Sequence, residues 1–201
     1  METYVLLMMI GFGAYAIRSA DQRRRIALLG SHLKNYQIEK LMEALTEGYI
    51  RALDAGDSGR SEQIWGLMND KEAALSDQFA RFAADIARLD PDATRMSRLA
   101  WSLPFADRLF PRLAFDMRKA LQIHARGIAA VVRNAAMRSP RERAFTLSAE
   151  MILMQHTCHW FCKSRTIASA RMLARHQTTY ERAVASVSPE TRQAYLELLA
   201  G

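Results

Sequence analysis

Residues 144–162 read AFTLSAEMILMQHTCHWFC, a segment that is apolar on nearly every face of a helix, with Glu150 as its only carboxylate. The surrounding run from Ser139 to Val187 contains no glycine, and its one proline stands at its second position. A helix that is apolar all round is buried on all sides. We therefore expect one long helix over 139–187, with other helices packed around it.

A helix start signal opens this run. Ser139 can cap the helix with its side chain, and Pro140 suits the first helical position because it has no N–H to leave unpaired. Glu142 can return a bond to the N–H of the capping residue. The three residues together predict a capping box.

Apolar residues recur at helical spacings of three and four in three further stretches, 26–53, 61–89 and 112–138. The first stretch follows an apolar run at 3–17, so the two could form one long N-terminal helix. Ser188 and Pro189 repeat the start signal and open a short helix that ends near Ala200. No stretch alternates apolar and polar residues as a half-buried strand does. The sequence predicts an all-α fold: an antiparallel bundle of four main helices, with a long N-terminal helix and a short C-terminal helix.

The stretch 91–111 is the least regular part, because it holds three of the five prolines. We expect a short helix over 93–100 and then a loop that Trp101, Phe105 and Phe110 fix to the core. An exposed apolar loop can instead be a docking surface, which is the alternative.

Composition favours a folded chain of 201 residues, half of them hydrophobic, with nine glycines. The two cysteines, Cys158 and Cys162, lie on one helical run. Neither a disulfide scaffold nor a zinc module with paired Cys-x-x-Cys motifs is therefore present, and a reducing compartment fits best.

Residues 3–17, TYVLLMMIGFGAYAI, carry no charge and precede a group of arginines at positions 18, 23, 24 and 25. We favour a membrane anchor, although 15 residues span about 22 Å of a hydrocarbon core of about 30 Å. A buried helix, in the fold or in an interface between copies of the chain, is the second interpretation. A cleaved signal peptide is the third, and it lacks a cationic start because Glu2 follows Met1.

The arginines after the apolar run should hold the rest of the chain in the cytoplasm. The expected organisation is a membrane anchor with its basic flank over 1–25 and a cytoplasmic helical bundle over 26–201. The expected location is the cytoplasmic membrane, with a single-pass or a peripheral attachment.

Candidate metal ligands gather on the organising helix at His156, Cys158, His159 and Cys162. At about 100° per residue, the last three fall within an arc of roughly 100°, and His156 lies about 60° outside it. His124 should lie level with the start of this group across the hairpin turn. Imidazoles and thiolates are ligands for zinc or copper, so a transition-metal or redox site is one hypothesis. Packed core residues are the alternative, which we favour, and we expect no cofactor.

Positive charge is concentrated over 112–180, which carries twelve basic and three acidic residues. Four of the basic residues recur every seven positions and form one helical stripe: Arg112, Lys119, Arg126 and Arg133. The stripe can contact anionic lipid or an acidic protein, or it can simply be solvated. Nucleic acid is less favoured, since neither a helix-turn-helix nor stacking aromatics accompany the charge.

The search for catalytic motifs finds no His-Glu-x-x-His, P-loop, Gly-x-Ser-x-Gly or di-iron Glu-x-x-His pattern. We therefore expect a non-enzymatic, membrane-tethered helical adaptor or scaffold. A bundle with a His/Cys metal or redox site is the alternative function, and a nucleic-acid-binding regulator is the third.

Overall fold

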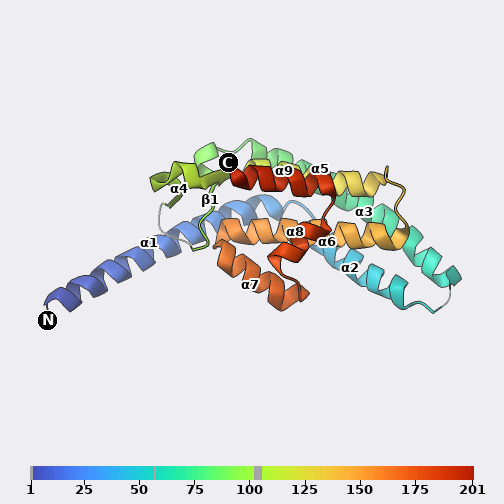
Figure 1. Cartoon of the computed structure of the whole chain (residues 1–201), viewed down its shortest axis with the longest axis horizontal. Helices are drawn as coiled ribbons and strands as arrows, with labels where there is room; N and C mark the ends of the chain where they lie inside the picture. Colours follow the sequence, from blue (N-terminus) through green and yellow to red (C-terminus); the bar gives the residue numbers. More distant parts are fainter. Residues whose placement is uncertain (1, 57, 102–105) are drawn as a thin grey trace.

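The computed structural model describes residues 2–56, 58–101 and 106–201. Most of the described chain is helical, and its strands form a two-stranded sheet. The predicted all-α class is confirmed. Figure 1 shows an elongated bundle, from one end of which α1 extends alone.

The N-terminal region forms two helices, α1 (Glu2–Leu33) and α2 (Ile38–Asp54), where one long helix was predicted. The turn between them is held by α3 (Ser58–Ala87). The Tyr36 hydroxyl donates to Asp85, and the backbone N–H of Gln37 donates to the side chain of Gln78. Residues 34–37, which form the turn, contain no proline or glycine. The contacts that hold the turn come from α3, a distant part of the chain, so the local sequence did not predict the break.

After α3, the chain forms short elements, namely η1 (Pro91–Ala93), β1 (Arg95–Ser97), α4 (Ala106–Leu109), η2 (Pro111–Leu113) and β2 (Ala114–Asp116). The predicted helix over 93–100 is wrong, because β1 pairs antiparallel with β2 and places Met96 opposite Phe115. Both side chains are buried, and the indole N–H of Trp160 donates to the carbonyl of Ser97. Three-residue strands are too short to give a readable alternation.

The prediction that aromatic residues fix this loop to the core is also wrong for two of the three. Trp101 is 77% exposed and Phe110 is 49% exposed. Phe105 lies outside the described residues. The segment therefore presents apolar side chains to its surroundings, together with Leu109 and Leu113.

The helix α5 (Met117–Arg133) is shorter at both ends than the predicted 112–138. Asp116 caps its start by accepting the N–H of Arg118. At its end, Asn134 adopts a left-handed conformation with φ of 51°, and its side chain bonds the backbone N–H and C=O of Arg138. Side-chain bonds of these types stop a helix where apolar spacing alone would extend it.

The run 139–187 is divided into α6 (Pro140–Cys162), α7 (Arg165–His176) and α8 (Tyr180–Ser186), so the single helix predicted there is wrong. Ser164 caps α7 and Thr179 caps α8 with their side-chain oxygens. The capping box of Ser139 and Glu142 is confirmed, as is the short last helix, α9 (Pro189–Ala200). Figure 1 shows α7 lying beside α6, to which it returns after the turn.

The main hydrophobic core lies between α2, α3, α5 and α6, in which α3 packs on α2 and α5, and α6 packs on α5 and α2. Its largest buried side chains include Leu45, Phe79, Phe82 and Phe161. A second apolar cluster joins α5 and α6 to α8 and α9 through Leu153, Val184 and Tyr195. The segment 144–162 contributes to both clusters, in agreement with its apolar composition.

The apolar half of α1 does not pack on the rest of the chain. Tyr4, Met8 and Phe12 are each at least 74% exposed, so burial of this helix within its own fold is not observed. Contacts with the bundle begin near Gln22, which accepts a bond from the Lys163 ammonium, and Arg25, which donates to the carbonyl of Arg95. By length and composition, Thr3–Leu33 is long and apolar enough to cross a membrane, a test that signal sequences also pass.

Candidate functional site

A cavity of about 330 Å³ lies where the inner half of α1 meets α2, α3, α6 and α7. Apolar side chains from four of these helices form its floor: Leu29, Leu33, Ile38, Met42, Phe82 and Met154. Ile26 also lines it and is 43% exposed. Gly30 contributes no side chain, and a Cβ added there would meet nothing within 4 Å. The floor is therefore a preformed apolar space that the chain itself leaves unfilled.

Basic side chains form the rim of this cavity. Lys163, Arg171 and Arg175 line it, and Glu39 is the one acidic residue among its lining. The Lys163 ammonium lies 3.0 Å from the amide oxygen of Gln22. Nη1 of Arg171 lies 3.3 Å from Nδ1 of His159. Arg175 makes no ion pair with the residues that the structure describes. The rim therefore has an excess of positive charge.

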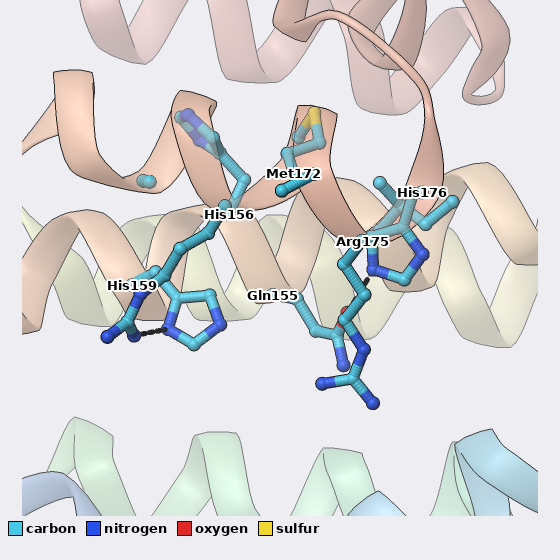
Figure 2. Close-up of a pocket in the computed structure, with 10 residues that line it drawn as sticks. Gln155, His156, His159, Met172, Arg175 and His176 are labelled. Atoms are coloured by element: carbon cyan, nitrogen blue, oxygen red, sulfur yellow. Dashed lines mark hydrogen bonds between the residues drawn. The ribbon is translucent and has the colours of Figure 1, made fainter.

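A second cavity of about 390 Å³ lies between α6 and α7 and adjoins the first. Four residues line both: Gln155, His159, Arg171 and Arg175. Figure 2 shows His156 and Met172 on one side of this site, and the His159 ring and the Arg175 guanidinium on the other. His176 closes it near the end of α7, with Nε2 3.1 Å from the amide oxygen of Gln155.

Burial and the neighbouring arginines set the charge of the histidines. Burial, and then the charges of Arg171 and Arg175, lower the pKa of His159. Burial, and then the charge of Arg175, lower the pKa of His176. Both imidazoles are therefore neutral near pH 7, and Nδ1 of His159 accepts the bond from Arg171. The positive charge of the site resides on the arginines and the lysine.

The five candidate metal ligands do not converge on one point. His124 is fully buried, with Nε2 2.9 Å from the hydroxyl of Thr157, which agrees with the register expected across the hairpin. His156 bonds Ser169 through Nε2 at 3.0 Å. Cys158, His159 and Cys162 line the first cavity together, as their helical spacing predicts. In the part of the chain that the structure describes, no group of three or more His, Cys, Asp or Glu residues is arranged to hold a metal ion, and the metal site stays a prediction.

The two cysteines are free and are held as thiols. Burial raises the pKa of Cys158 to about 12. Burial also raises the pKa of Cys162, against the opposing charges of Arg171, Arg25 and Lys163. A protonated thiol is a weak nucleophile and a poor metal ligand, so at neutral pH both side chains serve as small apolar parts of the cavity wall.

The basic stripe of Arg112, Lys119, Arg126 and Arg133 is exposed over its whole length. Arg112 belongs to η2, and the other three residues follow α5. From Lys119 to Arg133 the stripe covers about 21 Å of helix. In Figure 1, α5 runs from the end of the bundle where α1 emerges toward the opposite end.

Two buried carboxylates were not predicted as sites. Glu150 is fully buried, and its Oε1 accepts the N–H of Ser188 at 3.1 Å and the hydroxyl of Ser188 at 2.6 Å. Glu72 accepts the hydroxyl of Tyr49 at 2.7 Å and pairs with Arg143 at 3.0 Å. Burial raises the pKa of both acids. The burial of Glu150 could have been predicted from the sequence, because it is the one carboxylate in the apolar run 144–162. The sequence around Glu72 gives no comparable indication.

Comparison of the chain with protein-family models, curated proteins and solved structures finds no match.

Proposed function

We propose that this protein is a membrane-tethered helical adaptor, with α1 as its anchor and the bundle in the cytoplasm. The observation that carries the proposal is the exposure of the apolar half of α1. Val5, Leu6, Leu7 and Ile10 are each more than half exposed on a helix that continues without a break into the bundle. An exposed apolar surface of this extent requires a lipid or protein environment.

The continuity of α1 reduces the shortfall in length that a membrane span over 3–17 would have. Thr3–Ala20 supplies 18 helical residues, which cover about 27 Å of a hydrocarbon core of about 30 Å. Arg18 is the one charged residue in this window, and its long side chain can reach the headgroups. Arg23 and Arg24 follow on the exposed side of α1, in agreement with a cytoplasmic location of the bundle.

The end of the bundle nearest the anchor carries further groups suited to a membrane interface. Figure 1 shows α4 at this end, beside the point where α1 leaves the bundle. The exposed side chains of Trp101, Leu109 and Phe110 belong to the same segment, and Arg112 is exposed next to them. Aromatic and basic residues are enriched at membrane interfaces. This segment is the second contact of the proposed tether.

The basic stripe suits a protein partner better than the bilayer. If α1 spans the membrane along the bundle axis, only Arg112 lies near the headgroups, and Lys119, Arg126 and Arg133 extend away from them. Charges more than about 8 Å from a surface are largely screened at physiological salt. We propose that these three residues meet an acidic protein, which is the adaptor part of the function.

The tether is tested by fractionation of the full-length chain, with the membrane pellet extracted in carbonate and then in detergent. The wild type should require detergent, and a chain lacking residues 2–17 should be soluble. Leu7→Arg combined with Ile10→Arg should also release the protein, because two charges are costly in a hydrocarbon core. Both side chains are 60% exposed, so the substitutions should leave the fold intact.

Leu67→Arg is the matched control, since Leu67 is 65% exposed on α3 and should tolerate a charge without release. A full-length chain that stays in the carbonate supernatant contradicts the anchor. Ala14-Tyr15-Ala16 resembles a signal-peptide cleavage site. A measured mass that corresponds to a chain starting after Ala16 would therefore identify a cleaved signal peptide instead.

A further inference from the structure

We propose that the cavity between α1, α2, α6 and α7 binds a single-chain anionic amphiphile, with its chain on the apolar floor and its carboxylate or phosphate head on Arg171, Arg175 and Lys163. The inference concerns the bundle and goes beyond the tether, because the site exists whether or not α1 spans a bilayer.

The floor of the cavity supplies the apolar half of the site. Side chains from α1, α2, α3 and α6 enclose a space that is already open, so an occupant need not displace packed residues. A volume of 330 Å³ falls at the lower end of the range for ligand sites. At about 30 Å³ for a water-sized group, it holds roughly eleven heavy atoms. A chain of about ten carbons fits, and a two-chain phospholipid does not.

The polar half rests on the charge of the rim. The guanidinium groups of Arg171 and Arg175 are one helical turn apart on α7 and line both cavities. The nearest acid in the lining is Glu39, on the opposite helix α2, so three cations face one carboxylate. Guanidinium forks bind carboxylate and phosphate oxygens with two bonds at once. An anionic head at the rim would pair with cations that have no ion pair among the described residues.

The position of the site suits a ligand that comes from a membrane. Lys163 bonds Gln22, where α1 meets the bundle, and Ile26 lies one helical turn further along α1, so this side of the cavity is close to the proposed anchor. Fatty acids and anionic lysophospholipids have both the single apolar chain and the anionic head that the site requires. A soluble carboxylate or phosphate has only the anionic head. The experiment distinguishes these sources by comparing ligands of different chain length with acetate and inorganic phosphate, which have no long chain.

The test uses the full-length chain in nanodiscs of phosphatidylcholine and measures bound radiolabelled decanoate by equilibrium dialysis against empty nanodiscs. One site per chain is expected. Decyl phosphate should compete, decanol should bind at least tenfold more weakly, and acetate and inorganic phosphate should not compete. Equal binding of decanol, or equal competition by inorganic phosphate, would overturn the proposal.

A chain-length series distinguishes the cavity from partition into lipid. From hexanoate to decanoate the affinity should rise about fourfold for each methylene group buried. Beyond about ten carbons it should level off, because the cavity of about 330 Å³ is then full. An affinity that continues to rise at the same rate through longer chains indicates partition and contradicts the site.

Two pairs of variants locate the ligand. Gly30→Leu should fill the floor and lower decanoate affinity at least tenfold, whereas Gly66→Leu should leave it unchanged, since both glycines are helical and neither has a neighbour within 4 Å of an added Cβ. Arg171→Gln with Arg175→Gln should lower affinity about tenfold, and the exposed control pair Arg182→Gln with Arg192→Gln should not. Wild-type binding by Gly30→Leu would refute the proposed location.

Discussion

Gly127 shows how one small residue allows a carboxylate to be buried. A Cβ at this position would overlap Oγ1 of Thr191 and lie 2.7 Å from Oε2 of Glu150. The absence of that atom lets Glu150 lie between α5 and the start of α9, where its other oxygen receives two bonds from Ser188. The buried acid of α6 therefore joins three helices.

Gly127→Ala should lower the free energy of unfolding by roughly 1–3 kcal/mol, because the added methyl group overpacks a site with no free space. Gly66→Ala is the matched control. It adds the same atom to an open face of α3 and should stabilise the protein by up to about 1 kcal/mol through helix propensity. Urea denaturation of both variants measures the effect, and equal stabilities would contradict the role of Gly127.

His124 gives the stability of the protein a pH dependence. Burial lowers its pKa to about 3, from an ordinary value near 6.5, so the folded state binds fewer protons than the unfolded state between these values. This contribution is complete above pH 6.5 and is lost as the pH falls toward 3. By linkage, about 2 kcal/mol disappears between pH 7 and pH 5.

His124→Gln should be less stable than the wild type at pH 7, because the packed imidazole is replaced. Its stability should nevertheless fall by roughly 2 kcal/mol less on acidification to pH 5. His156, with a pKa lowered by burial to about 4, acts in the same direction, and the raised pKa values of Glu72 and Glu150 act in the opposite one. His156, Glu72 and Glu150 are present in the wild type and in His124→Gln. Their contributions therefore cancel when the stability changes of the two proteins are subtracted. Parallel pH profiles of the two proteins would disprove the assignment.

At the scale of elements, local signals predicted the helix starts better than the helix ends. The capping box at Ser139 and the start at Pro189 could be read directly, because each depends on neighbouring residues. The turn after Cys162 has no glycine or proline, and Ser164, which caps α7, was the one residue there that could have indicated a new helix start. That turn returns α7 to α6 and brings Arg171 next to His159. The cavity between these helices could not be predicted from a single continuous helix.

The capping box supports α6, a helix that contributes to both apolar clusters. Ser139→Ala removes the oxygen that accepts the N–H of Glu142 and should lower the free energy of unfolding by about 1 kcal/mol. The side-chain bond from Ser139 also lowers the pKa of Glu142, so that pKa should return toward its ordinary value in the variant. Thermal unfolding and a carboxyl NMR titration measure the two effects, and unchanged values in both would exclude the box as a source of stability.

At the scale of the whole molecule, the direction of α1 decides which surface faces the membrane. A helix that leaves along the long axis sets the bundle on its end, with the adjoining ends of α2 and α3 farthest from the bilayer (Figure 1). Trp101 lines a small cavity with Asp21 and Gln22 of α1, so it lies at the end nearest the bilayer. Trp65 lies near the end of α3 that adjoins α2, about 33 Å of helix from the other end of α3. Trp160 is buried and serves as an internal reference.

Brominated lipids in nanodiscs should therefore quench the fluorescence of Trp101 and spare that of Trp65. In the variant Trp101→Phe most of the quenching should disappear, and in Trp65→Phe it should remain. A bundle that lies flat on the bilayer would bring both ends near the lipid, and the two variants would then lose quenching to similar extents. That result would contradict the upright orientation. The basic stripe on α5 could then contact anionic headgroups directly.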